Sequence, residues 1–337
     1  MFGHALRTPK RKSDYHVPMP LDAQSQAVLD MMAAAGLPPI ETTLPGQAGA
    51  LRASMRDSFS ALAGNVPEVA HVEDRTVAGV PVRFYWPQSV NPLPIVVYFH
   101  GGGWVLGDIE TYDTSCRALA LASGCIVASV EYRLAPEHPF PAPLDDCYAV
   151  TKYIADNPHE FGADASRLAV GGDSAGGNLA AAVTLLARER GGPDIRFQLL
   201  IYPATDFSAD TGSVEEFADG HFLTRAGMRW FWKQYAGHAE NGLHHLVSPL
   251  NADNLSGLPS AFVMTAECDV LRDQGESYAQ RLEEAGVPVR LKRYDGAIHG
   301  FFSMAGLLDQ GKVAMTDAGA ALWSTLGARA ATSGEVY

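Results

Sequence analysis

Short apolar runs alternate along most of the chain with longer stretches in which apolar residues recur at helical spacing. Runs of this length, rich in β-branched residues and bounded by turn residues, predict buried strands, whereas the longer stretches predict amphipathic helices. The expected strands are 82–86, 95–99, 126–130, a run from 168 that ends at a glycine turn, 197–203, 261–266 and 289–294. Strands separated by helices indicate an α/β fold with a mostly parallel sheet covered on both faces. Active sites of such sheets lie at the carboxyl ends of the strands.

Two segments depart from this alternation. Residues 1–55 contain a helical pattern at 22–35 and the start of a second at 49–62, with no visible chemistry in either. We interpret 1–55 as an N-terminal cap segment in front of a catalytic domain, 56–337. Residues 205–242 interrupt the alternation with a group of aromatic residues, Phe222, Trp230, Phe231, Trp232 and Tyr235. These rings either serve packing alone or form the wall of a second cap segment over an apolar pocket.

Composition narrows the classes of function. The formal net charge is −13, from 38 acidic and 25 basic residues, which argues against a nucleic-acid partner. No stretch of 18 apolar residues and no signal-peptide pattern is present, so we expect a soluble, cytoplasmic protein without stable membrane insertion. The cysteines form no C-x-x-C pair and are expected to be buried free thiols: Cys116, Cys125, Cys147 and Cys268. Dinucleotide-binding and zinc-protease motifs are absent from the sequence, so neither cofactor nor metal is expected.

The strand that begins at Leu168 ends in a Gly-x-Ser-x-Gly turn centred on Ser174, and an Ala- and Leu-rich helical pattern follows at once. Gly172 and Gly176 stand two residues either side of Ser174, where a Cβ would crowd so tight a turn. This context is typical of a nucleophilic serine lifted above the sheet, with the backbone N–H of Ala175 directed at the reacting centre. The alternative is a chance match to a short motif.

A glycine loop follows the strand 95–99, in the order His100, Gly101, Gly102, Gly103, Trp104. Consecutive glycines let the backbone bend and expose its N–H groups, which is what stabilisation of an oxyanion requires. A flexible loop or a phosphate cradle is the alternative.

A serine nucleophile needs a histidine base, and the histidine needs a carboxylate that fixes its tautomer. His299 follows the last expected strand, at the edge of the sheet where Ser174 is expected. Hydrolases with this kind of elbow place the acid between serine and histidine in the sequence. Asp269 directly follows a strand, and we prefer it to Glu267, which lies close to the strand, and to Asp273, which we expect to cap the next helix.

Together these motifs resemble the hormone-sensitive-lipase-like family of α/β-hydrolases, and in particular its bacterial-type esterases with Asp before the nucleophile. The resemblance rests on 100–104, 131–137, 172–177, 269–273 and 299–301, which occur in family order. It implies Ser174, Asp269 and His299 as the catalytic residues. It further implies the N–H groups of Gly102, Gly103 and Ala175 as the oxyanion hole, with the N–H of Gly101 as a further candidate. Val270 stands where the family more often has Pro. Residues 1–55 resemble the family only in being a variable cap region, without a shared motif.

The sequence therefore predicts a carboxylic-ester hydrolase that acts on small-molecule esters of short to medium acyl chain through an acyl-enzyme. Homodimerisation is expected only as a tendency of the family. One alternative is a non-catalytic binding protein on the same fold, which the presence of His299 disfavours. Another is a hydrolase of a different acyl bond, in an amide, a lactone or a long-chain lipid.

Overall fold

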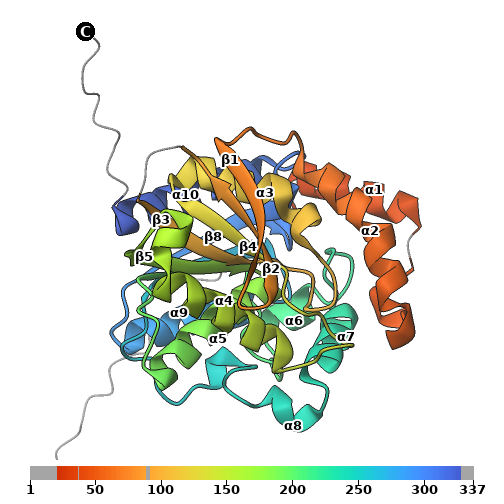
Figure 1. Cartoon of the computed structure of the whole chain (residues 1–337). Coiled ribbons are helices and arrows are strands. Elements are labelled where there is room, and N and C mark those ends of the chain that lie inside the picture. The colour runs from red at the N-terminus through yellow and green to blue at the C-terminus, as the bar shows by residue number, and fades with distance from the viewer. Residues whose placement is uncertain (1–20, 37, 89–91, 328–337) are drawn as a thin grey trace, which may run out of the picture.

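A single eight-stranded sheet runs through the molecule, with strand order β1-β2-β4-β3-β5-β6-β7-β8 (Figure 1). The structure is a computed structural model, and it describes residues 21–36, 38–88 and 92–327. The strands are β1 (His71–Val77), β2 (Val80–Trp86), β3 (Leu93–Phe99), β4 (Ile126–Val130), β5 (Ala163–Asp173), β6 (Phe197–Ile201), β7 (Ser260–Cys268) and β8 (Val289–Ile298). Strands β1 and β2 pair antiparallel, and every pairing from β4 to β8 is parallel. The prediction of a mostly parallel sheet is confirmed.

Helices cover both faces of this sheet. Contacts place α3 (Ile109–Ser123) and α10 (Asp309–Leu326) together on one face. On the other face α4 (Ala142–Asp156) packs on α5 (Ala175–Arg190), and α9 (Arg272–Glu284) packs on β7 and β8. Strands β3, β4 and β6 are buried along their whole length, which explains why their sequences are almost entirely apolar.

Local signals define several helix ends. Asp108 accepts a hydrogen bond from the Thr111 N–H at the start of α3, and Gly124 ends that helix in the left-handed conformation. The expected capping role of Asp273 is wrong, because α9 begins at Arg272 and Asp273 lies in its first turn. The Asp273 carboxylate instead accepts from the backbone N–H of Ser213, 2.8 Å away.

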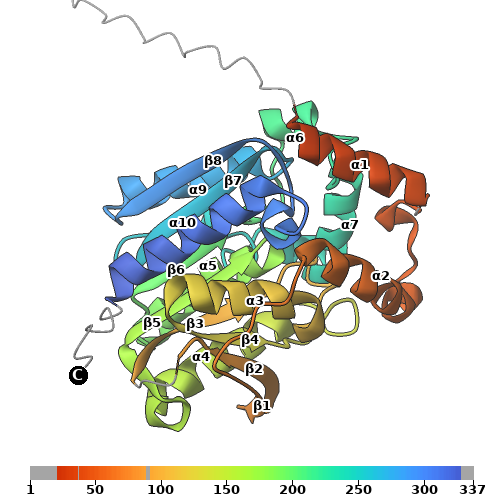
Figure 2. The ribbon, with the colours of Figure 1, turned by 90° about the horizontal axis from the view of Figure 1, so that it is seen from above.

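The predicted cap segments lie beside each other at one side of the sheet (Figure 2). The N-terminal segment contributes α1 (Ala23–Ala35), the 3-10 turns η1 (Ile40–Thr42) and η2 (Pro45–Gln47), and α2 (Ala48–Ala63). The later segment forms α6 (Gly212–Glu216), α7 (Arg225–Ala236) and α8 (Ala239–Gly242). The Trp230 indole N–H joins the two segments, since it donates to the Thr43 carbonyl at 3.1 Å. Residue 55, the predicted boundary, lies within α2, and residues 1–20 of the predicted cap lie outside the described part of the chain.

Short 3-10 turns complete the described chain: η3 (Pro158–Phe161), η4 (Pro249–Asn251) and η5 (Phe301–Met304). The cysteine prediction is confirmed, because Cys116, Cys125, Cys147 and Cys268 are all buried and unpaired. Across residues 21–36, 38–88 and 92–327, the helices are too short or too polar to span a bilayer.

Candidate active site

Ser174 lies at a sharp turn between β5 and α5, with φ 55° and ψ −116°. A non-glycine residue in this region of backbone space costs of order 1–3 kcal/mol, so the surrounding fold must impose it. A Cβ at Gly172 or Gly176 would collide with the Phe99 carbonyl oxygen at the end of β3. The two glycines therefore let the elbow pack directly on the neighbouring strand, and the sequence-based reason for them holds.

Three side chains from three loops form one hydrogen-bonded chain at the carboxyl edge of the sheet. His299 Nε2 lies 2.9 Å from Ser174 Oγ, and His299 Nδ1 lies 2.7 Å from Asp269 Oδ2. Asp269 is fully buried, and its other oxygen accepts from the Leu271 N–H at 2.9 Å. The carboxylate thus favours the tautomer with a proton on Nδ1 and leaves Nε2 free to accept the serine proton. The structure brings together the three side chains that the sequence selected.

The rival carboxylates have other partners. Glu267 is buried, and its Oε2 accepts from the Gly296 N–H at 2.8 Å. Asp273 accepts from the Ser213 N–H and from Arg272 Nε. Of the three candidates, Asp269 is the one whose carboxylate bonds to His299.

The glycine loop leaves β3 beside the elbow, because β3 pairs with β5 in a register that sets Phe99 opposite Gly172. Gly102 has φ 109° and Gly103 has φ 60°, conformations that favour glycine. Within the described residues, the N–H groups of Gly102, Gly103 and Ala175 donate to no protein acceptor. The Gly101 N–H donates instead to Asp173 Oδ1 at 3.0 Å, so this further candidate is already engaged.

Asp173 ties this loop to the elbow. Its carboxylate also accepts from the Tyr98 hydroxyl through Oδ1 and from the Tyr112 hydroxyl through Oδ2, each at 2.9 Å. Burial raises the pKa of Asp173 to about 6, and these hydrogen bonds to the ionised form hold the rise in check. Asp173 is thus a buried acceptor that fixes the start of the glycine loop.

His100 holds the same loop from the other side. Its Nδ1 lies 2.8 Å from the Gly101 carbonyl oxygen, and since a carbonyl can only accept, Nδ1 carries the proton. Burial lowers the pKa of His100 to about 4. The ring stacks on Tyr132 with centroids 4.3 Å apart, and the Tyr132 hydroxyl donates to the His100 carbonyl. The glycine loop therefore begins with a neutral histidine whose role is structural.

Helix α2 contacts the glycine loop through Arg52. The guanidinium donates to the Val105 carbonyl at 2.6 Å and to the Ala135 carbonyl at 2.8 Å, and it pairs with Glu137 at 2.7 Å. Arg133 pairs with Asp146 in the same region, also at 2.7 Å. Arg–carboxylate pairs thus hold the loop 131–141, and Arg52 ties that loop to α2.

A serine elbow, a histidine and a buried carboxylate at the edge of a parallel sheet match the α/β-hydrolase architecture, and a family model described as alpha/beta hydrolase fold matches residues 96–303. The chain belongs to the α/β-hydrolase family. Within it, the hormone-sensitive-lipase-like assignment is confirmed by similar carboxylesterases. A carboxylesterase (NlhH) of Mycobacterium tuberculosis is 46% identical over 250 residues, covering 71% of this chain and 78% of that protein. The ethyl acetate hydrolase of Pseudomonas putida is 36% identical over 289 residues, covering 81% and 89%.

Solved structures agree with this assignment. A mutant of LAE6, an α/β-hydrolase enzyme from the metagenome of Lake Arreo in Spain, superimposes with a TM-score of 0.87 at 45% identity, covering 91% of this chain and 99% of that one. A hyperthermophilic esterase from the archaeon Pyrobaculum calidifontis gives 0.86 at 41% identity, covering 91% and 99%. As an α/β-hydrolase with these relatives, the chain is a serine ester hydrolase.

Aromatic rings of the segment 205–242 and of α2 border the site of this α/β-hydrolase. Phe231 of α7 packs so closely on Gly103 that a Cβ there would collide with its ring. Phe222 lies against Gly300, next to His299, and Phe59 of α2 lies 6.3 Å from Phe222 between ring centroids. Trp232 and Tyr235 pack on Trp104 instead. The aromatic group therefore contains both packing residues and rings beside the site.

Sequence reasoning missed Tyr202, whose ring lies 4.7 Å from that of His299 between centroids. Its position directly after β6, at the active edge of the sheet, was the available signal. Sequence reasoning also gave Asp173 no partner, because Tyr98 and Tyr112 come from distant segments. Among the described residues, no group of His, Cys, Asp and Glu side chains is arranged to hold a metal ion.

Proposed function

We propose that this protein is a carboxylesterase that cleaves small esters through a Ser174–His299–Asp269 triad and an acyl-enzyme. The observation that carries the proposal is the pair of contacts at His299, 2.9 Å to Ser174 Oγ and 2.7 Å to Asp269. The first contact lies within the range in which a general base can take a proton from a hydroxyl, and the second is the hydrogen bond that orients the base. The catalytic residues come from the domain 56–337, and the segments 1–55 and 205–242 act as caps.

In this reaction Ser174 Oγ attacks the ester carbonyl while His299 Nε2 takes its proton. Asp269 stabilises the imidazolium that forms, and the free N–H groups of Gly102, Gly103 and Ala175 receive the oxyanion. His299 then protonates the departing alcohol, leaving the acyl group on Ser174. Water attacks the acyl-enzyme with His299 again as base, and release of the acid restores the serine.

The residues that border the site indicate the kind of acyl group that it accepts. Phe222 and Phe231 of the segment 205–242 and Phe59 of α2 give the site apolar borders. These borders favour an uncharged hydrocarbon acyl chain, and short to medium chains are the proposed substrates. Names of similar proteins, such as the ethyl acetate hydrolase, point to the same class of substrate. A cytoplasmic location and a homodimer remain predictions, to be checked by cell fractionation and by light scattering.

Covalent labelling tests the mechanism. Diethyl p-nitrophenyl phosphate should add one diethylphosphoryl group to the protein, and peptide mapping should locate it on Ser174. A His299→Ala variant that folds as the wild type should label far more slowly, because the hydroxyl loses its base. Modification of another residue, or equal labelling of both proteins, would refute the proposed triad.

A further inference from the structure

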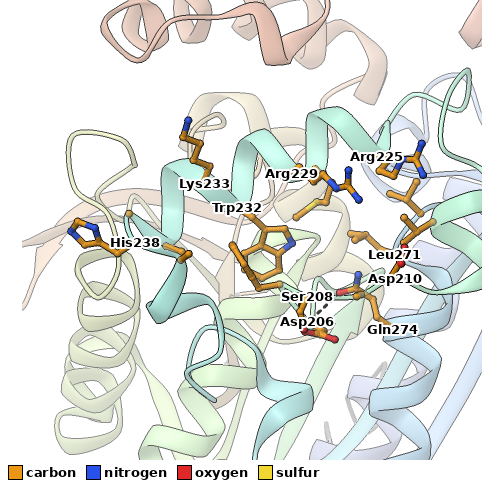
Figure 3. Close-up of a pocket in the computed structure, with 18 residues that line it drawn as sticks. Asp206, Ser208, Asp210, Arg225, Arg229, Trp232, Lys233, His238, Leu271 and Gln274 are labelled. Atoms are coloured by element: carbon orange, nitrogen blue, oxygen red, sulfur yellow. Dashed lines mark hydrogen bonds between the residues drawn. The ribbon is translucent and has the colours of Figure 1, made fainter.

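A cavity of about 660 Å³ lies between α7 and the loop 206–210, outside the catalytic site. None of Ser174, His299 and Asp269 lines it. On α7 the lining residues include Arg225, Arg229 and Lys233, which recur at helical spacing on a face that turns away from Phe231 and the glycine loop. The volume falls within the range of small-molecule pockets, about 300–1,000 Å³. Figure 3 shows the Trp232 indole directed from α7 into this space.

Apolar side chains make up the interior of this pocket. Trp232 meets Phe207 edge to face, with ring centroids 5.8 Å apart. Val214, Met228 and Leu271 are buried and line the rest of the interior. Such a lining suits a hydrocarbon tail or an apolar ring.

Positive and negative side chains lie at different sides of the pocket rim. Arg229 and Lys233 are exposed, one helical turn apart, and neither pairs with a carboxylate among the described residues. Arg225 differs, since it pairs with Glu215 at 2.6 Å. Figure 3 shows Asp206 on the opposite side of the pocket, where its Oδ1 accepts from the Ser208 N–H and hydroxyl, and Asp210 near Leu271. The Arg229–Lys233 end therefore offers two cations to an anion that enters along α7.

We propose that this pocket is a second ligand site, which binds an amphipathic monocarboxylate with its tail against Trp232 and its carboxylate at Arg229 and Lys233. The acid released from a medium-chain ester belongs to this class, so a product of the enzyme is a natural occupant. The proposal rests on the ester-hydrolase activity for its supply of ligand, but it does not depend on which residue is the nucleophile.

The pocket wall is continuous with the segment that holds the triad acid. Val270 and Leu271 line the pocket, and the Leu271 N–H donates to Asp269 Oδ1 at 2.9 Å. The Ser213 hydroxyl donates to the Val270 carbonyl at 3.2 Å, which connects α6 to the same segment. A ligand packed on Leu271 thus contacts the residue that orients Asp269. Occupancy of the pocket is expected to lower kcat. Because the same acid also competes with the ester in the catalytic cleft, inhibition by the acid should be mixed.

The test uses sodium octanoate as the probe and the full-length wild-type protein. Calorimetric titration of the wild type is compared with that of the pocket variant Arg229→Gln/Lys233→Gln. The control is Lys152→Gln/Arg196→Gln, which removes the same charge from exposed cations elsewhere. Inhibition of p-nitrophenyl acetate hydrolysis is measured on all three. We expect the pocket variant to bind octanoate about three- to tenfold more weakly and to lose the effect on kcat, while the control behaves as the wild type.

Two results would overturn the proposal. One is purely competitive inhibition that is equally strong in all three proteins, which would place octanoate in the catalytic cleft alone. The other is tighter binding of octyltrimethylammonium than of octanoate at this pocket, which would assign its charge preference to Asp206 and Asp210. Calorimetry reports binding without turnover, so a protein inert toward esters would contradict the proposed function and leave the pocket test intact.

Discussion

Asp173→Asn should change how stability depends on pH. Burial raises the pKa of Asp173 from 3.8 to about 6, so the folded protein binds this proton more tightly than the unfolded chain does. The contribution of Asp173 to stability is therefore fully present below about pH 4 and is lost as pH rises through about 6. A shift from 3.8 to about 6 corresponds to a total of about 3 kcal/mol. Asparagine cannot ionise, and the variant should lack this loss.

The measurement is urea-induced unfolding of both proteins from pH 5 to pH 8, with the free energy of unfolding compared at each pH. Between these limits the wild type should lose about 1 kcal/mol relative to the variant, because part of the change occurs below pH 5. Other titrating groups are common to both proteins and cancel in the difference. The Asn side-chain oxygen can still accept from Tyr98 and the Gly101 N–H, so the variant retains two of the contacts.

Tyr112→Phe is the matched control for this reasoning. It removes a hydrogen bond to the ionised carboxylate, so the pKa of Asp173 should rise further and the loss of stability between pH 5 and pH 8 should grow. The absolute destabilisation should be about 1–3 kcal/mol, the cost of a buried polar group left without its partner. A pH-independent difference between wild type and Asp173→Asn would refute the account of Asp173 as a buried carboxylate that ionises near pH 6.

Further predictions concern the site and its supports. Asp269→Asn should reduce kcat for p-nitrophenyl acetate by about 10³- to 10⁴-fold with little change in KM, because the imidazole loses the partner that fixes its tautomer; a loss below tenfold would contradict the role of Asp269. Gly102→Ala should reduce kcat/KM by about 10²- to 10³-fold, since its Cβ would collide with the Leu106 carbonyl and displace an oxyanion donor; unchanged kinetics in a folded variant would count against that donor. Arg52→Met should reduce kcat/KM by about three- to thirtyfold through loosening of the glycine loop, with Arg167→Met as a remote control, and equal effects of both substitutions would exclude a specific role.

The sequence predicted the sheet, the elbow and the positions of Ser174, Asp269 and His299 because each is encoded locally. Strand β3 is a buried apolar run followed by His100 and three glycines, and Asp269 and His299 directly follow β7 and β8. Strand ends of a parallel sheet meet at one edge, so local signals were enough to group these residues.

Contacts between distant segments escaped prediction. Tyr98 and Tyr112 meet Asp173 across 75 and 61 residues of sequence, and no periodicity reports such pairings. Asp273 looked like a helix cap, yet α9 begins one residue earlier and its carboxylate bonds to Ser213 of the second cap segment. The pocket between α7 and the loop 206–210 likewise depends on how that helix packs against distant parts of the chain. Tertiary packing decided each of these features.

The central claim is that Ser174 carries out ester hydrolysis, and turnover of p-nitrophenyl esters of increasing acyl length tests it most directly. Wild type and Ser174→Ala are purified in parallel and compared at equal concentration, with folding of the variant checked by its thermal unfolding transition. The account predicts that wild-type activity peaks at short to medium chains and that the variant loses it at every length. Equal activity in the two proteins, or a folded wild type inert toward all of the esters, would contradict it.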